Sequence, residues 1–273
     1  MPALESFSIS ACSLNTNVFP LDYSRPFLKH VKFERTYSGP ILERAHVDGV
    51  QIIEARGTPL EHTIMQALYG ISSLSESQQH LLTHLDLRLI CSKTEPSSLE
   101  YWYAGEVASW FAMLPKGSLP NLEVLFILVP LRGPYINYFL DKISAGKLKT
   151  LWFGMRWDAL CQCGHAALYR LAEFRSLEEI FLPCSGDDFT VIFDLARAPR
   201  LAHVHFQIEI NIDATGQIAK RCGAFIKTLQ TVSWVNQMTI SLERDTEGKI
   251  IRMEFRAYEE PAWLEFGTAA SGW

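Results

Sequence analysis

A motif of three apolar residues, spaced as L-x-x-L-x-L, recurs along almost the whole chain and leaves few folds open to it. The motif occurs more often than a random arrangement of the same residues would give. Its first positions follow one another at a mean spacing of about 27 residues, within the range of periods that indicates stacked repeats. Each repeat buries its apolar face only against its neighbours, so the motifs predict a solenoid. They begin at Leu4, Leu28, Leu82, Leu122, Leu148, Leu177, Leu201 and Leu229, with weaker versions at Val47 and Ile250.

The segments between the motifs have the apolar spacing and the end signals of helices. The pair Asp187-Asp188, for example, lies on the first turn of a predicted helix, where the helix dipole favours acidic residues. We therefore expect an α/β order in which the strands of a parallel sheet alternate with helices on one side. Strands are predicted near residues 5–9, 29–33, 84–88, 123–128, 149–153, 178–182 and 203–208, and helices at 99–114, 134–144, 158–174, 189–196 and 214–229.

The end of the chain has a different pattern. Residues 238–243 and 249–258 alternate apolar and polar side chains around a turn that contains Gly248, which predicts a β-hairpin. The weak motif at Ile250 then belongs to this hairpin and not to a repeat. We expect a single domain over residues 1–260, with repeats in 1–235 and a C-terminal hairpin cap in 236–260, followed by a disordered tail at 261–273.

The segment Leu4-x-x-Phe7-x-Ile9-x-x-Cys12-x-Leu14 has the eleven-residue form of a leucine-rich repeat, with Cys12 where that family places Asn or Cys. The segments LPNLEVL, KLKTLWF, RSLEEIFLP and APRLAHVHF have the same character. Over nearly its whole length the chain resembles leucine-rich-repeat proteins, especially the irregular F-box-like repeat proteins of fungal type. The resemblance implies an irregular leucine-rich-repeat solenoid, with a curved parallel sheet and convex helices, and a substrate-recognition role in a ubiquitin-ligase-like system.

The chain departs from that family in two ways. Beyond Cys12, the ninth motif position carries no continuous row of Asn or Cys, and the first motif at Leu4 leaves no room for an F-box, the module that docks to a ubiquitin ligase. We therefore expect a recognition array without its docking part. Because Phe7 and Ile9 then lie at an uncapped edge, we also expect either a homotypic contact through the N-terminal edge of the sheet or poor solubility.

Composition and charge argue against several classes of protein. A net charge of −5 and a pI near 5.9 argue against nucleic-acid binding, which needs a basic field. No apolar run reaches the roughly 18 residues of a membrane span, and the N-terminal residues lack the basic and apolar regions of a secretory signal. The six cysteines are spread thinly, unlike those of a small secreted scaffold, so we expect reduced thiols and a cytoplasmic or nuclear location.

Two clusters contain residues that bind metals or react. The segment Cys161-Gln-Cys163-Gly-His165 predicts a zinc or thiol site only if its glycine breaks the predicted helix, because the second cysteine otherwise points away from the other two side chains. His203 and His205 share one face of a strand but lack a third ligand there. Neither cluster alone predicts a site.

The motifs of known enzyme classes are absent from the sequence. No nucleophile elbow, phosphate loop, dinucleotide fingerprint or metalloprotease motif occurs. We therefore expect a non-enzymatic protein-binding module without a cofactor or a metal. Two alternatives stay open: a thiol- or metal-dependent enzyme that uses the Cys161, Cys163 and His165 region or the pair His203 and His205, and a degenerate paralogue with no retained role.

The fifth position of the motif, between the last two apolar residues, faces away from the core and predicts where a partner binds. Its occupants are aromatic in the middle of the chain and polar at both ends, which is typical of a binding site. If they bind a partner, Trp152→Ala costs about 2 kcal/mol of binding and little stability. Two alternatives stay open: the rings are covered by the insertion at 82–122, or they form an aromatic ladder that only stabilises the sheet. The fifth positions are Ser8, Lys32, Gln51, Asp86, Phe126, Trp152, Phe181, His205 and Ser233, and the predicted partner-binding residues among them are Phe126, Trp152, Phe181 and His205.

Overall fold

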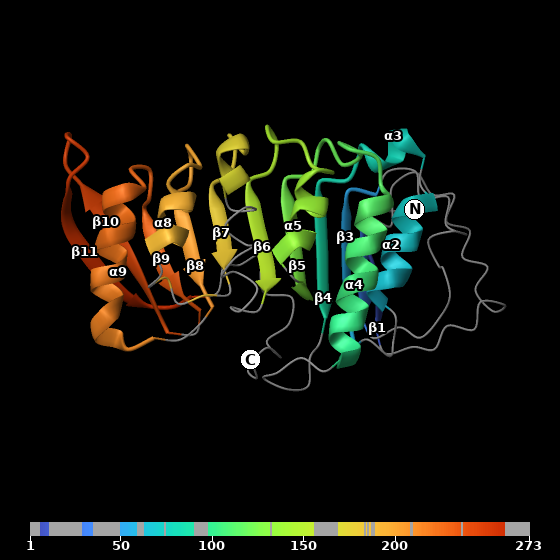
Figure 1. Cartoon of the computed structure of the whole chain (residues 1–273), viewed down its shortest axis with the longest axis horizontal. Helices are drawn as coiled ribbons and strands as arrows, with labels where there is room; N and C mark the ends of the chain where they lie inside the picture. The colour runs from blue at the N-terminus through green and yellow to red at the C-terminus, as the bar shows by residue number, and fades with distance from the viewer. Residues whose placement is uncertain are drawn as a thin grey trace. The chain divides into compact units, whose positions relative to one another are not determined.

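The chain divides into two compact units. Figure 1 labels helices and strands of both units. The N-terminal unit consists of Met1–Leu131 with Tyr135–Ser144, and the C-terminal unit consists of Arg132–Pro134 with Ala145–Trp273. The structure is a computed structural model. It describes residues 6–10, 29–34, 50–58, 63–73, 75–89, 98–131, 133–155, 169–182, 184, 186, 189–207, 210–235 and 237–259.

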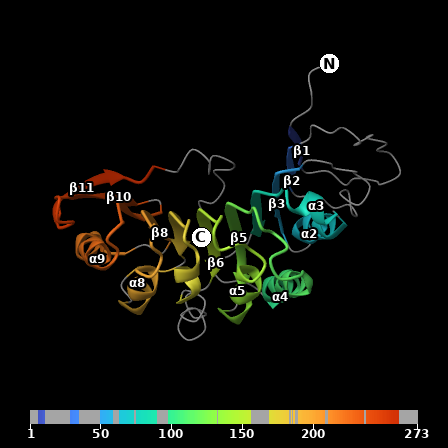
Figure 2. The same ribbon diagram turned by 90° about the horizontal axis from the view of Figure 1, so that it is seen from above.

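The N-terminal unit contains parallel strands and the helices that follow them. Its strands are β1 (Ser6–Ser10), β2 (His30–Glu34), β3 (Ile52–Gly57), β4 (His84–Leu89) and β5 (Val124–Leu131), and its helices are α2 (Thr63–Ser73), α3 (Glu76–Gln79), α4 (Ser98–Met113) and most of α5 (Gly133–Leu140). Each strand pairs in parallel with the next one along the chain. Figure 2 shows α2, α4 and α5 on one face of these strands.

Two polar contacts fix α4 in the N-terminal unit. Nε1 of Trp110 donates a hydrogen bond to Oγ of Ser72 in α2 at 2.7 Å, which joins the two helices. Nζ of Lys142 donates to the backbone oxygen of Leu114 at 2.6 Å, just after the end of α4. The last carbonyls of a helix have no partner within the helix, so the 7% exposed Lys142 caps this end.

The C-terminal unit contains strands that are parallel at first and antiparallel at the end. Its strands are β6 (Thr150–Met155), β7 (Glu179–Leu182), β8 (His203–Phe206), β9 (Thr231–Trp234), β10 (Met238–Arg244) and β11 (Ile250–Ala257), and its helices are the 3-10 helix η3 (Arg170–Glu173), α8 (Phe189–Leu195) and α9 (Ile212–Phe225). Strands β6 to β9 pair in parallel, and β10 pairs antiparallel with both β9 and β11. Figure 2 shows α8 and α9 on one face of the strands. The predicted parallel strands and the C-terminal hairpin are therefore confirmed, and Gly248 has a φ of +80° in the hairpin turn.

A repeated backbone hydrogen bond links successive motifs. Within each unit the N–H of the second motif position donates to the carbonyl oxygen of the second position in the preceding motif, at 2.8 to 2.9 Å. The apolar positions of the full motifs are buried wherever the structure describes their side chains. These bonds join Lys29, Gln51, Thr83 and Glu123 in the N-terminal unit, and Lys149, Glu178, Ala202 and Gln230 in the C-terminal unit. Gln51 is a second position because the third motif begins at Val50 and not at Val47.

The third motif lies three residues later than the sequence predicted. The weak match at Val47 placed Gln51 in the fifth position, but the strand is β3, and Ala55 is among its buried residues. The motif therefore begins at Val50, and Glu54 occupies the fifth position, beside Asp86 of β4. Ala55 is small, so a search for large apolar residues missed this register.

The helices confirm most of the predicted segments but differ in their bounds. α4, α5 and α8 lie where they were expected, whereas α2 was not predicted. α9 begins at Ile212 because Oδ1 of Asn211 accepts a hydrogen bond from the backbone N–H of Asp213 and caps the helix. Of the predicted helix at 158–174 only residues 169–174 are described, and the tail at 261–273 lies outside the described residues. In the part of the chain that is described, no helix is long and apolar enough to cross a membrane.

Candidate functional site

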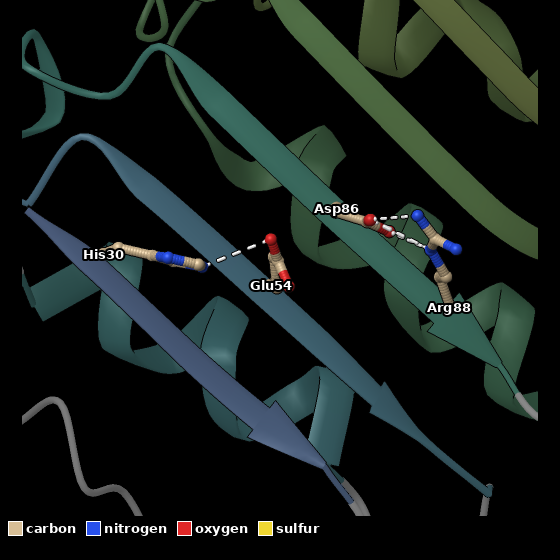
Figure 3. A network of polar contacts seen from close by, with 4 residues as sticks. All are labelled: His30, Glu54, Asp86 and Arg88. Carbon is tan, nitrogen blue, oxygen red and sulfur yellow. Dashed lines mark hydrogen bonds and ion pairs between the residues drawn. The ribbon is translucent and has the colours of Figure 1, made fainter. Parts of the chain in front are cut away.

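The distal face of each unit is the face of its strands that is turned away from the helices. Side chains that alternate with the buried motif positions lie on this face. In the N-terminal unit the register places the fifth positions side by side: Lys32 beside Glu54, Glu54 beside Asp86, and Asp86 beside Phe126. Opposite charges therefore meet between β2 and β3, whereas two acidic residues meet between β3 and β4. Figure 3 shows the polar contacts that each acid makes with a basic side chain.

His30 and Glu54 are in contact between β2 and β3 (Figure 3), and the contact is an ion pair when the imidazole is protonated. Nε2 of His30 lies 3.2 Å from Oε1 of Glu54, and the two side chains are 20% and 9% exposed. Burial alone would raise the pKa of Glu54, but the hydrogen bond to His30 and the charges of His30, His84 and Lys32 outweigh it. The pKa of Glu54 therefore lies below its ordinary value, and the fold stabilises its carboxylate form.

Asp86 and Arg88 form a second ion pair on β4 (Figure 3). Nε of Arg88 lies 2.8 and 2.9 Å from the two carboxylate oxygens of Asp86, and Nη2 lies 2.6 Å from Oδ2. The side chains of Arg88 and Asp86 are 14% and 6% exposed, and the guanidinium carbon lies 5.8 Å from the centre of the Phe126 ring. Because two nitrogens of the guanidinium donate to one carboxylate, the pair fixes the orientation of the guanidinium plane as well as its distance from the carboxylate.

His84 lies on the same strand as Asp86, two residues before it. Its ring meets the ring of Phe126 edge-on, with the centroids 5.7 Å apart. Burial lowers the pKa of His84, against the opposing effect of the charges on Asp86 and Glu54. Within the described part of the chain, the buried Nε2 of His84 has no hydrogen-bond partner, which agrees with a neutral ring.

Three rings stack along the distal face of the C-terminal unit. The rings of Trp152 and Phe181 are inclined by 17° with centroids 4.4 Å apart, and those of Phe181 and His205 by 6° with centroids 4.0 Å apart. The strand register places each residue directly beside the next. Stacked aromatic pairs add stability beyond the area that they bury. The aromatic ladder is the stack formed by Trp152, Phe181 and His205.

Hydrogen bonds hold the histidines of β8 to the neighbouring strands. Nε2 of His205 lies 2.9 Å from Oε1 of Glu179, and Nδ1 of His203 lies 2.8 Å from Oγ1 of Thr231. Burial lowers the pKa of His203, against the opposing effect of the charge on Glu179. Both rings are therefore oriented by contacts on adjacent strands.

Acidification is expected to lower the free energy of unfolding in two stages. His84 and His203 have lowered pKa values, so their contribution is complete above the ordinary pKa of 6.5 and is lost as the pH falls through the folded values. Glu54 also has a lowered pKa, so its contribution is complete above 4.5 and is lost in more acidic solution. Urea unfolding at a series of pH values measures both stages. His84→Gln should reduce the first stage, and a stability that does not change with pH would contradict this expectation.

The four predicted partner-binding residues fall into two groups. Trp152, Phe181 and His205 come together in the aromatic ladder, whereas Phe126 lies in the N-terminal unit. The exposed fractions of Phe126, Trp152, Phe181 and His205 are 0%, 9%, 0% and 5%. This burial favours the alternative in which the rings stabilise the sheet. Partner contact through these four residues stays a prediction.

Lys32 and Asp86 were placed on the distal face from the sequence, but the polar residues that contact them or lie beside them were missed. Glu54 was missed because the third motif was placed in the wrong register, and His30 and Arg88 because they lie two residues from the fifth position. The signal was present, since residues two apart on a strand share a face. The spacing of Asp86 and Arg88 could therefore have identified them in the sequence as opposite charges on one face of β4.

The candidate thiol and metal groups are described only in part. Within the described residues, no group of three or more His, Cys, Asp or Glu side chains could hold a metal ion. Burial raises the pKa of Cys222 to about 12, so this thiol is not a nucleophile at neutral pH. The groups outside the described residues are Cys161, Cys163, His165, Asp187 and Asp188.

The distal faces of the two units differ in the groups that they carry. In the N-terminal unit these groups are charged, and in the C-terminal unit they are mainly aromatic. The chain matches no family model and no curated protein, so its function has to be inferred from this geometry and from its sequence.

Proposed function

We propose that the chain is a non-catalytic protein-binding module, built as an irregular leucine-rich-repeat solenoid. Two regularities support the repeat: the same motif positions are buried, and the same hydrogen bond recurs between second positions within each unit. The register then brings one fifth-position side chain per motif into a row on the distal face. Repeat proteins bind through such surfaces because every repeat extends them by one strand.

One observation carries the proposal: in the N-terminal unit, buried acids hold bases that are partly exposed. Glu54 and Asp86 are 7% and 4% exposed. Among the described side chains of this face, the charged groups that remain partly exposed are therefore the cations Lys32, Arg56 and Arg88. We therefore expect a protein partner with an acidic surface. The half-buried bases of this face are His30, Lys32, Arg56 and Arg88.

The wider role rests on the sequence resemblance. Because the resemblance is to F-box-like repeat proteins, the proposed role is substrate recognition in a ubiquitin-ligase-like system, in the cytoplasm or the nucleus. The acidic net charge and the thinly spread cysteines support an intracellular protein partner. The homotypic contact through the N-terminal edge stays a prediction, since the side chains of β1 lie outside the described ones.

Partner binding is expected to depend on the half-buried bases. Lys32→Ala and Arg56→Ala should each weaken binding by about tenfold, because each removes a partly exposed cation from the face where the partner is proposed to bind. Partners captured from a cell extract by the wild-type chain are identified first. The dissociation constant of each purified partner is then measured for the wild-type chain and both variants.

Lys220→Ala is the matched control for these variants. Lys220 is an exposed cation on α9, so its removal lowers the net charge by the same amount without changing the distal face of the N-terminal unit. Binding should be unchanged in this variant. Equal losses in all three variants, or none in any, would contradict the proposal. Stoichiometric zinc in the purified protein, or a thiol with a strongly lowered pKa, would favour the thiol- or metal-dependent enzyme.

A further inference from the structure

The last strand of the C-terminal unit has one open edge. Among the described strands, β11 pairs with β10 alone, and it is 8 residues long. Two of its large apolar side chains, Ile251 and Phe255, are 58% and 53% exposed. A long edge strand with exposed apolar side chains is a template on which another strand can pair.

The charges along β11 alternate in sign. Edge strands are commonly protected by repelling charges, by proline or by a short length. β11 contains no proline, and its exposed charged residues, Arg252, Glu254 and Arg256, share the distal face. The apolar residues between them face α9, and the Phe255 ring lies 3.5 Å from where a Cβ on Gly216 would be. β11 therefore has one apolar face and one face with charges of both signs.

We propose that β11 pairs with β11 of a second copy of the chain, antiparallel and centred on Met253. In this register Arg252 of each copy lies opposite Glu254 of the other, so two ion pairs form across the two-fold axis. Phe255, which is 53% exposed, lies on the apolar face of the same stretch, so the pairing also removes apolar surface from water. The main chains of the two edges satisfy each other's hydrogen bonds, as in strand addition.

Neighbouring registers lack this match. Centring the pair on Glu254 places that residue opposite itself and Arg252 opposite Arg256, so every charged pair is repulsive. Centring it on Phe255 pairs Glu254 with Arg256 but puts Arg252 opposite Tyr258, beyond the end of β11, so a shorter stretch of the two edges pairs. The register centred on Met253 pairs Arg252 with Glu254 and uses more of the strand.

Sedimentation velocity of the full chain over a dilution series tests this register by charge exchange. The wild-type chain should form a dimer. Arg252→Glu and Glu254→Arg should each weaken the dimer by about tenfold or more, because both ion pairs become repulsive pairs. An equal mixture of the two variants should regain the dimer, since the heterodimer again has opposite charges at both places.

Glu247→Lys is the matched control, because it reverses an exposed charge in the turn between β10 and β11, outside the paired stretch. Arg256 is unsuitable because it forms an ion pair with Glu254 of the same strand at 3.5 Å. Glu247→Lys should change the dimer constant by less than about twofold. Circular dichroism establishes that each variant is folded. A wild-type chain that stays monomeric at millimolar concentration, or a mixture of variants that stays monomeric, would overturn the proposal. So would a dimer that survives both reversals, as one held at the N-terminal edge would, or one that Glu247→Lys weakens as strongly.

Discussion

Arg88→Met is expected to lower the free energy of unfolding by about 3 kcal/mol, because it leaves a buried carboxylate without its counter-charge. Asp86 is 4% exposed, and Nε and Nη2 of Arg88 contact its carboxylate at 2.6 to 2.9 Å. Methionine keeps much of the length of the arginine side chain but donates no hydrogen bond. Urea unfolding followed by circular dichroism measures the loss.

Two controls separate a buried pair from a surface pair. Asp86→Leu combined with Arg88→Met should recover most of the lost stability, because neither charge then remains without a partner. Arg170→Met removes a cation from the pair with Glu173, whose side chains are 22% and 55% exposed, and should cost less than about 1 kcal/mol. An equally small loss for Arg88→Met would show that water screens the pair on β4.

Most of the fold was predictable because the motif contains large apolar residues at fixed spacing. Leu85 and Leu87 of β4 are examples: both are fully buried, and both were placed in a parallel strand from the sequence. β3 was missed because Ala55 occupies a motif position and is too small to be counted. α2 follows β3, and it was not predicted because no strand had been assigned before it.

Less of the candidate site was predictable, because burial depends on neighbours that are distant in the sequence. The motif did place Trp152, Phe181 and His205 on adjacent strands, as the register confirms. It could not indicate that their rings stack within 4.4 Å and lose nearly all their exposure. The pairing of His30 with Glu54 was likewise out of reach, since it depends on the register of β2 against β3.

Trp152→Ala is expected to lower the free energy of unfolding by about 3 kcal/mol, comparable to the loss from Leu151→Ala. Trp152 is 9% exposed and stacks on Phe181, so its removal leaves a cavity beside a ring that is itself fully buried. If Trp152 were instead an exposed partner-binding residue, as the sequence predicted, Trp152→Ala would cost little stability. Urea unfolding of both variants measures the two losses. A Trp152→Ala protein as stable as the wild type would contradict a structural role for the ladder.

The central claim is that equivalent positions of successive motifs pack against one another in a row. A double-mutant cycle of Trp152→Ala with Phe181→Ala, measured by urea unfolding, tests this most directly. The predicted coupling energy is about 1 kcal/mol, typical of a stacked aromatic pair. Leu151→Ala with Phe181→Ala is the control cycle, because these side chains lie on opposite faces of their strands, and its coupling should stay below about 0.5 kcal/mol. Equal coupling energies in the two cycles, or no coupling between Trp152 and Phe181, would contradict the packing of equivalent motif positions in a row.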